Sequence, residues 1–411
     1  MKAVRAGEWP ALVLSFLFFF LLLACYYTIR PLRDALVAGL GTTELKFLVT
    51  AIFFVMLAVT PTFGWLMTHV PRRILLPRVF AFFASNLVLF AIAFAALGTS
   101  AWPARAFYVW VLVFNFFAVS LFWSFMADIW REEQSRRLFG AIAAGGSVGG
   151  LSASLLTQAL VARIGNVGIT LVAAALLSGT VVCLLRLRTM SSHNETATIA
   201  KQSAFTGSIW QGFFLILRSP FLLGVAMLVL LGTTTAQFAY SETTRLAKES
   251  FADPEARTAF FANLDFWTNA ISLALQALIV GLLTARFGVA MPLVGQAVIS
   301  LLAYASLAFS PLLMTLAVSN VARRSAEFGL GKPARDMLYT VATPQEKYLA
   351  KNVIDTALAR GGDVCAVWIY SGLTAFGVAL AGLGAISAVA MIAAVFIALA
   401  IVRGYRARGG K

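Results

Sequence analysis

Apolar stretches of roughly 20 residues recur from one end of the chain to the other, and they restrict its fold more than any other feature. A helix of that length matches the thickness of a lipid bilayer. Hydrophobic residues make up 60% of the 411 residues and charged residues only 12%, about half the charged share of an average soluble domain. Membrane β-barrels show short alternating segments instead. The sequence therefore predicts an all-α membrane protein.

Twelve spans are predicted, six on each side of a long polar interruption. Their ranges are 11–31, 45–68, 75–97, 106–127, 138–161, 166–187, 221–241, 259–284, 288–309, 311–331, 354–376 and 380–402. We expect an N-terminal six-helix bundle at 1–187, a cytoplasmic central loop at 188–219 and a C-terminal six-helix bundle at 220–411. From Ser208 onward, the loop has the pattern of an amphipathic helix on the membrane surface.

Lysine and arginine gather at both ends of the chain and in the even-numbered loops, whereas loops 3–4, 5–6 and 9–10 are nearly free of them. Basic loops stay in the cytoplasm, so both termini of this multi-pass protein are predicted to be cytoplasmic. The segments after spans 1 and 7 are exceptions. In loops 2–3 and 4–5 we expect a latch that closes the cytoplasmic side, formed by Arg72, Arg73, Asp128, Arg136 and Arg137.

The two halves of the chain share a weak pattern of charges. Span 1 ends in Arg30-Pro-Leu-Arg33-Asp34, and the segment after span 7 reads Arg245-Leu-Ala-Lys248-Glu249. A two-fold repeat of six-helix units is the architecture of alternating-access carriers, which bind their solute between the halves near the middle of the membrane. The pattern therefore favours a carrier with two pseudo-repeats.

The stretch YYTIRPLRDALV, residues 26–37, contains the charges of span 1. One interpretation is an interfacial belt, with the tyrosines and arginines at the level of the lipid headgroups. The other is that Arg30 and Arg33 face a central cavity, and the matched pattern after span 7 favours this. Surplus cations facing such a cavity would attract anions.

Span 8 carries four polar residues on one helical face, at the spacing i, i+4, i+7 and i+11. They are Asp265, Asn269, Ser272 and Gln276. A polar stripe in a membrane helix faces protein or water, because lipid offers no hydrogen bonds. Hydrogen bonding between helices and the lining of a polar cavity are equally good explanations.

Span 10 holds Arg323, Arg324 and Glu327 more than a dozen residues from its start at Pro311. A charge near the bilayer centre costs at least ~3 kcal/mol on insertion scales, so each needs a partner or water. The spacing permits an ion pair within the helix, but one carboxylate cannot neutralise two guanidinium groups. One cation is left for another partner, and span 11 offers further carboxylates. The charged residues of span 11 are Asp355, Arg360 and Asp363.

Several other classes of site are disfavoured by the sequence. The three cysteines all fall in apolar segments, and His69 and His193 fall in predicted loops, so we expect neither disulfides nor a metal centre. The glycine-rich run GAIAAGGSVGG at 140–150 lacks the Lys-Ser/Thr of a phosphate-binding loop, and close helix packing or a bending gate helix explains it. No nucleophile motif is present either. We expect no cofactor and no enzymatic activity.

The chain resembles the major facilitator superfamily, and within it the bacterial and plastid ATP/ADP translocases with their bacterial relatives. YYTIRPLRDALV followed by ELKFLV is similar to the translocases' Tyr-Thr-Ile-Leu-Arg-Asp-Thr-Lys-Asp stretch. On this match, Arg30, Arg33 and Asp34 take the places of its Arg, Lys and Asp. SLFWSFMADIWREEQSRRLFG resembles their Phe-Trp-Gly-Phe-Ala-Asn segment and the basic loop after it.

The resemblance continues through the second half of the chain. GKPARDMLYTVATPQEKYLAKNVIDTALARGGD is similar to the Pro-Thr-Lys-Glu-Met-Ala-Tyr segment, with Arg335 and Asp336 at its Lys-Glu, and Glu242 falls near an acidic position of the translocases' seventh span. GWLMTHVPRR is a loose form of the superfamily's loop 2–3 signature. Two departures from the translocases concern the solute. The translocases carry an acidic residue in span 4, which this chain lacks, and Glu327 takes the place of a lysine in their tenth span.

We therefore predict a twelve-helix secondary transporter of the bacterial inner membrane, working by alternating access as a monomer among membrane lipids, without nucleic acid. Its partner is a small anionic solute, with nucleotides and other phosphorylated compounds as candidates. The predicted substrate contacts are Arg30, Arg33, Arg323, Arg324, Asn269 and Gln276. The predicted gating or coupling residues are Asp34, Glu242, Asp265, Glu327, Arg360 and Asp363.

Two alternatives use the same helices. One is a proton-coupled exporter of amphipathic compounds or lipids, which the 13% aromatic content permits. Such an exporter needs a mostly aromatic cavity with a single titratable carboxylate. The other is a membrane sensor that transports nothing. Direct measurement of solute binding and countertransport separates the three.

Overall fold

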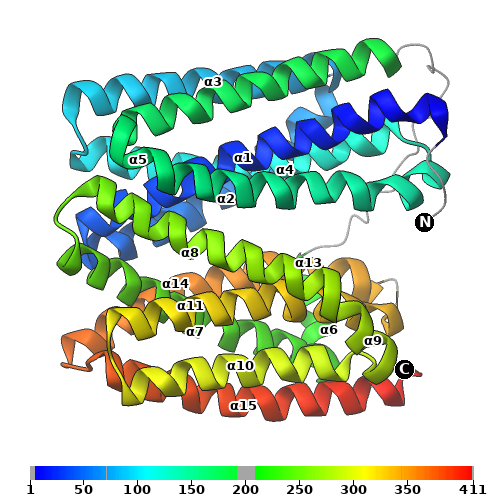
Figure 1. Cartoon of the computed structure of the whole chain (residues 1–411). Coiled ribbons are helices and arrows are strands. Elements are labelled where there is room, and N and C mark those ends of the chain that lie inside the picture. Colours follow the sequence, from blue (N-terminus) through cyan, green and yellow to red (C-terminus); the bar gives the residue numbers. More distant parts are fainter. Residues whose placement is uncertain (1–4, 71, 192–208, 344, 410–411) are drawn as a thin grey trace. The chain divides into compact units, whose positions relative to one another are not determined.

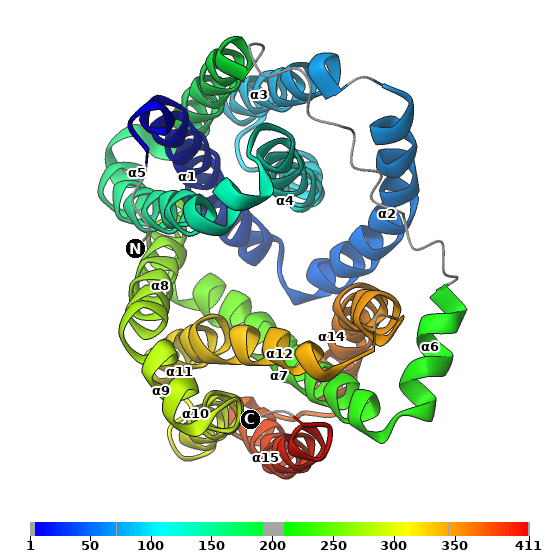
Figure 2. The same ribbon diagram turned by 90° about the vertical axis from the view of Figure 1, so that its right-hand side faces the viewer.

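The computed structural model describes residues 5–70, 72–191, 209–343 and 345–409. These residues are almost entirely helical, and they contain no β-strand (Figures 1 and 2). The helices of the first half are α1 (Trp9–Leu40), α2 (Thr42–His69), α3 (Arg72–Leu97), α4 (Ala101–Ile129) and α5 (Glu132–Ser191), with a short turn η1 (Ala6–Glu8) before α1.

The second half has more interrupted helices, several of which contain short π-helical segments. In order they are α6 (Ile209–Arg218), α7 (Pro220–Ser250), α8 (Pro254–Ala274), η3 (Leu275–Val280), α9 (Gly281–Phe287), α10 (Ala290–Phe309), α11 (Leu313–Ala326), η4 (Glu327–Gly331), α12 (Lys332–Leu338), η5 (Tyr339–Val341), η6 (Glu346–Ala350), α13 (Lys351–Val353), η7 (Ile354–Leu358), α14 (Ala359–Ala375) and α15 (Leu380–Ala407). Of these short segments, η3, η4, η6 and η7 are π-helical.

Each predicted span coincides with helix to within a few residues. Within the described ranges, nine helical stretches are long and apolar enough to cross a membrane. Spans 5 and 6 merge into the 60-residue α5, whose chain turns at Gly165 with a positive φ of 65°. Spans 10 and 11 are divided into shorter helical pieces, so they are absent from the nine. The chain is a multi-pass membrane protein with an all-helical fold.

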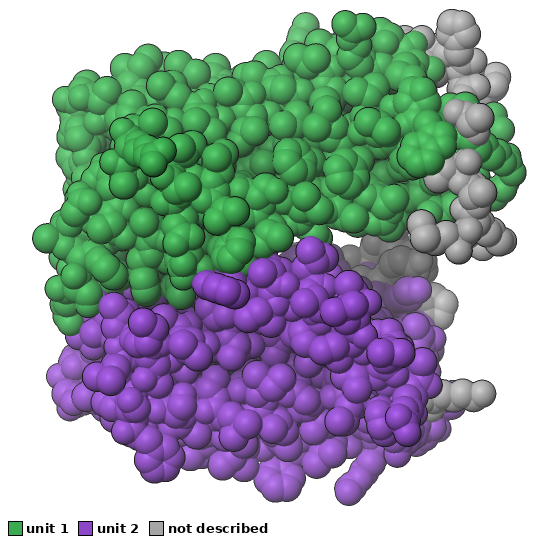
Figure 3. Space-filling view, in the orientation of Figure 1, with its two compact units in different colours: residues 1–41, 54–200, 247–266 green, residues 42–53, 201–246, 267–411 purple. Residues whose placement is uncertain are grey.

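The chain forms two compact units, and each combines segments from both halves of the sequence (Figure 3). Unit 1 contains residues 1–41, 54–200 and 247–266, and unit 2 contains residues 42–53, 201–246 and 267–411. Unit 1 has a core rich in phenylalanine, centred on Phe18, Phe80, Phe107, Phe114 and Phe122. The core of unit 2 is mainly aliphatic and includes Leu222, Leu293, Leu316 and Ala398. The start of α2 thus packs with C-terminal helices, and the start of α8 packs with N-terminal ones.

In unit 1, the glycine-rich run of α5 lies against α1. A Cβ atom on Gly149 would lie 2.3 Å from the main-chain oxygen of Phe20, and one on Gly145 would lie 2.5 Å from that of Phe16. Gly146 faces the ring of Phe19 just as closely. Small residues allow helix backbones to approach in this way in a membrane, where close packing replaces the hydrophobic effect as the driving force. The run is a packing surface in this structure.

In unit 2, two π-helical segments lie beside each other where α8 meets α11. The side chain of Gln276 in η3 donates a 2.9 Å hydrogen bond to the main-chain oxygen of Phe328 in η4. A Cβ atom on Gly329 would lie 2.8 Å from Cβ of Leu275. A π-helical turn releases main-chain groups from the usual α-helical pairing. A side chain from the neighbouring helix satisfies one of them here.

The close approach of α1 and α5 gives a direct test. Gly149→Ala should lower the thermal unfolding midpoint of the purified full chain, because overpacking of this kind costs about 1–3 kcal/mol. Gly140→Ala is the matched control, since a Cβ atom there meets nothing within 4 Å. The control should leave the midpoint unchanged or raise it, because alanine favours helix. Equal midpoints for the two variants would contradict the packing described.

Candidate functional site

The charges of α1 lie inside unit 1. The helix continues through Pro31 without a break, so Arg30, Arg33 and Asp34 remain within its ordered turns. The Arg33 guanidinium donates to Oδ1 of Asp34 from both Nε, at 2.9 Å, and Nη2, at 2.6 Å. It also lies 5.6 Å from the ring centre of Tyr108 in α4. The two side chains are only 8% and 7% exposed, so this ion pair is buried.

Arg30 pairs with a carboxylate from a distant part of the chain. Its Nε lies 3.5 Å from Oδ2 of Asp265 in α8, and the side chains are 16% and 2% exposed. The guanidinium also lies 5.7 Å from the ring centre of Tyr27. Both α1 arginines predicted to bind substrate therefore have a carboxylate within unit 1. Their burial differs from the exposure of an interfacial belt.

In unit 2, Glu242 of α7 is held by two partners. Arg245 donates to its Oε2 from Nε at 3.0 Å and from Nη2 at 2.7 Å. The phenol of Tyr370 in α14 donates to its Oε1 at 2.8 Å. The Glu242 side chain is 3% exposed, whereas that of Arg245 is 36% exposed. The carboxylate is thus the buried member of this pair, and the cation is the accessible one.

In span 10, the direct partner of Glu327 is not one of the arginines with which its spacing permits a pair. Glu327 accepts a 2.6 Å hydrogen bond from Nη2 of Arg335, eight residues further along the chain. Within the described part of the chain, Arg323 has no carboxylate within 4 Å. Its Nη2 makes a long contact of 3.5 Å to Oδ1 of Asn320, and its Nε is buried without a hydrogen-bond partner. Arg324, beside it, is half-buried.

The neutral side chains next to Arg323 hold it between helices. Asn320 donates a 2.6 Å hydrogen bond to the Thr243 hydroxyl of α7. Ser319 of α11 donates to the main-chain oxygen of Ala303 in α10 at 2.9 Å. These bonds join α11 to α7 and α10 around the arginine. Its surroundings are therefore polar but carry no balancing charge in direct contact.

The other predicted site residues of unit 2 lie in varied settings. Gln276 is exposed and bonded to the Phe328 main chain, while the Asn269 amide nitrogen is buried without a hydrogen-bond partner among the described residues. Arg360 and Asp363 form a 3.5 Å pair, with side chains 52% and 27% exposed. No group of three or more His, Cys, Asp or Glu residues in the described ranges is placed to hold a metal ion.

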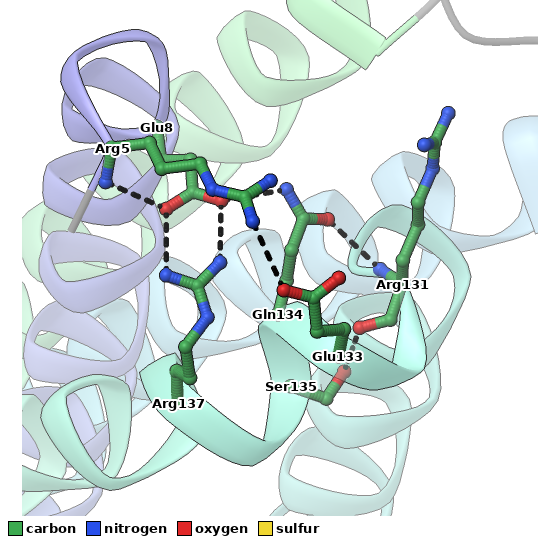
Figure 4. Close-up of polar contacts among 7 residues, drawn as sticks. All are labelled: Arg5, Glu8, Arg131, Glu133, Gln134, Ser135 and Arg137. Atoms are coloured by element: carbon green, nitrogen blue, oxygen red, sulfur yellow. Dashed lines mark hydrogen bonds and ion pairs between the residues drawn. The ribbon is translucent and has the colours of Figure 1, made fainter. Parts of the chain in front are cut away.

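Of the predicted latch residues, Arg137 forms a buried ion pair with Glu8. The side chains of Arg72, Arg73 and Arg136 lie outside the described part of the structure, and Asp128 is exposed. Arg137 donates from Nη2 to Oε1 of Glu8 at 2.9 Å (Figure 4). This pair joins the start of α1 to the start of α5, both within unit 1.

Glu8 is the centre of this small network (Figure 4). It also accepts hydrogen bonds from the Gln134 amide, at 3.0 Å, and from the main-chain N–H of Arg5, at 3.0 Å. The hydrogen bond from Gln134 lowers the pKa of the Glu8 carboxyl most, followed by that from Arg5 and by the Arg137 guanidinium. Sequence reasoning missed Glu8, because a glutamate before a first span carries no pattern of its own.

Comparison with known proteins identifies relatives. No family model matches the sequence. The ADP,ATP carrier protein 1 of Chlamydia muridarum is 25% identical over 334 residues, and that of Chlamydia trachomatis serovar D is 23% identical over 334 residues. Each match covers 72% of this chain and 63% of the relative. The chain is related to the ADP,ATP carriers. It spans less than two thirds of the length of these curated relatives.

Solved structures of transporters share the fold. The POT family transporter PepTSo superposes with a TM-score of 0.65 at 11% identity, covering 97% of this chain and 98% of that one. The nucleoside transporter NupG superposes with a TM-score of 0.59 at 15% identity, covering 97% of this chain and 99% of that one. These likenesses show that the chain has the same fold as these transporters. The relationship suggested by the sequence motifs is thus confirmed.

The network around Glu8 predicts a pH-dependent stability. Because folding lowers the pKa of Glu8, its stabilising contribution is present above its unfolded pKa of about 4.3 and is lost as pH falls through the folded value. Glu8→Gln should therefore lower the thermal midpoint at pH 7, and the difference from wild type should disappear in acid. Glu133→Gln, whose partner Arg5 is 69% exposed, is the control and should change little. A constant difference at every pH would refute the assignment.

Proposed function

We propose that the chain is a secondary transporter that moves a small anionic solute across the bacterial inner membrane by alternating access. In this proposal the chain crosses the membrane twelve times, with both termini in the cytoplasm. Residues 1–187 and 220–411 are the two six-helix halves, and residues 188–219 link them. The basic loops and the recurring charge pattern support this topology.

One observation carries the anionic character of the solute. Arg323 lies in a helix of unit 2, part-buried, and no described carboxylate is within 4 Å of it. Glu327 is near enough to interact electrostatically with Arg323, but its direct hydrogen bond at 2.6 Å is to Arg335. An unbalanced charge inside a membrane protein costs several kcal/mol unless something pairs with it. A bound anion is the simplest partner, so Arg323 is the proposed main contact, with Arg324 beside it.

Other arginines in the predicted spans have different roles in this scheme. Arg30, Arg33 and Arg245 are each paired with a carboxylate. The guanidinium groups of Arg30 and Arg33 can still bind an anion through their remaining N–H groups, because each has five donors. We therefore assign Arg30 and Arg33 as secondary contacts, whose carboxylates Asp265 and Asp34 compete with the solute.

The chemical class of the solute is narrowed by the relatives. The curated relatives are named ADP,ATP carriers, and one structural neighbour is a nucleoside transporter. A phosphate group suits a guanidinium, which offers two parallel N–H donors. Nucleotides are therefore the first candidates to test, followed by other phosphorylated compounds. An uncharged or cationic amphipathic substrate would not pair with Arg323.

Arg323→Gln tests the proposal. We expect it to weaken binding of ADP, or of whichever phosphorylated compound binds wild type, by roughly 10- to 100-fold, because a charge-assisted hydrogen bond contributes about 1.5–3 kcal/mol. Isothermal titration and countertransport in liposomes measure the effect. The matched control is Arg286→Gln, which removes an exposed arginine from α9 and should leave binding unchanged.

The stability of the same variant separates a binding role from a structural one. Removing an unbalanced charge should keep or raise the thermal midpoint of the ligand-free protein, whereas breaking a structural pair would lower it. A lower midpoint together with unchanged binding would remove the basis for Arg323 as the contact. If no phosphate- or carboxylate-bearing compound binds wild type, the anion-transport proposal itself falls.

A further inference from the structure

The pair between Glu242 and Arg245 has an uneven exposure that a purely structural ion pair does not need. The side chain of Glu242 is 3% exposed, and that of Arg245 is 36% exposed. Arg245 donates from both Nε and Nη2 to the same oxygen, Oε2. The more accessible cation can therefore be approached by an anion, while the carboxylate behind it cannot move into water.

We propose that Glu242 is a proton site that couples anion binding at Arg245 to the uptake of one proton. An anion that binds Arg245 withdraws the guanidinium from Glu242. The carboxylate would then be a buried charge without its counter-ion, which strongly favours its protonated form. This inference rests on the proposed transport of an anion, and it adds a coupling ion and a mechanism.

The charges balance through the exchange. Before binding, the Glu242 carboxylate and the Arg245 guanidinium form a neutral pair. Afterwards, the guanidinium pairs with one negative charge of the solute, and one proton from water has bonded to a carboxylate oxygen of Glu242. The cluster is neutral in both states, which avoids the cost of a net charge in a low-dielectric region. No other reactant is needed.

Tyr370 suits both states of the carboxyl. Its phenol donates to Oε1, the oxygen that Arg245 does not use. A protonated carboxyl retains an oxygen that accepts a hydrogen bond, so the phenol still has a partner after the exchange. Tyr370 itself is 2% exposed and packs on Phe238 of α7. Its position is thus fixed while the arginine changes partner.

Arg323 lies on α11, which is joined to α7 by the hydrogen bond from Asn320 to Thr243, and it has no carboxylate in direct contact among the described residues. The charged groups on α14 and α2 have partners. On α14, Asp363 pairs with Arg360 two turns before Tyr370. On the first turns of α2, Lys46 donates to the Ser371 hydroxyl at 3.3 Å and lies 5.0 Å from the ring of Trp368. The described groups that contact the Glu242 carboxylate are therefore Arg245 and Tyr370. Removal of Arg245 leaves only a neutral donor.

A ligand-free experiment tests the central step. Arg245→Gln mimics the withdrawn guanidinium, so its infrared spectrum near neutral pH should gain the C=O stretch of a protonated carboxylic acid. The band should be absent from wild type and from the Arg245→Gln/Glu242→Gln double variant. Arg286→Gln, which removes an exposed arginine, is the control and should show no such band. A Glu242 that stays ionised in folded Arg245→Gln would overturn the inference.

A second experiment uses wild type, so it does not depend on the folding of Arg245→Gln. ADP is titrated calorimetrically in two buffers of different ionisation enthalpy, which counts the protons taken up. Wild type should take up about one proton more than Glu242→Gln. The affinity of wild type for ADP should therefore fall by up to tenfold for each unit by which the pH rises. Glu133→Gln, which removes a carboxylate that is 71% exposed and lies in unit 1, should behave as wild type.

The outcomes of the two experiments are separable. ADP binding with equal proton uptake in wild type and Glu242→Gln would overturn the coupling and leave the anion proposal standing. Absence of binding by ADP would count against nucleotide transport, and the infrared result would still decide whether Glu242 takes a proton when Arg245 is withdrawn.

Discussion

A charge within a membrane-spanning unit has to be balanced nearby, and this requirement organises the polar interior of the protein. Water is not available to solvate an isolated ion there, so each guanidinium needs a carboxylate, a ring face or a ligand. Arg33 and Asp34 meet the requirement within one turn of α1, and Arg30 meets it through Asp265 of α8. Arg323 has no carboxylate in direct contact among the described residues, and it is informative for the same reason.

The pairs of the two units differ in how firmly the cation is held. In unit 1 the side chains of Arg30 and Arg33 are 16% and 8% exposed, and each guanidinium also lies near a tyrosine ring. In unit 2, Arg245 is considerably more accessible than its partner Glu242. Under the proposals made above, the first kind of pair positions helices, whereas the second kind exchanges partners with a solute.

Much of the fold followed from the sequence, because apolar length and turn residues are local properties. Each predicted span lies on helix, and the motifs of residues 26–37 indicated the correct relatives. The pairing of charges was less accessible. The spacing permits a pair between Glu327 and an arginine one turn before it, whereas its direct partner is Arg335. Asp265 was recognised as part of a polar stripe, but its partner Arg30 was not. Such pairs depend on which helices become neighbours, and a single helical face does not specify this.

The π-helical segment η4 is a geometric reason why the partner of Glu327 could not be read from the spacing of an α-helix. Glu327–Gly331 lies between Arg323 and Arg335, and its wider turns hold more residues than α-helical ones. One extra residue shifts the angular phase of everything after it by roughly 100°, given 3.6 residues per α-helical turn. The faces presented by α11 and α12 are therefore set independently. If η4 rewound into a regular α-helix, the side chain of Arg335 would rotate about the helix axis relative to that of Arg323.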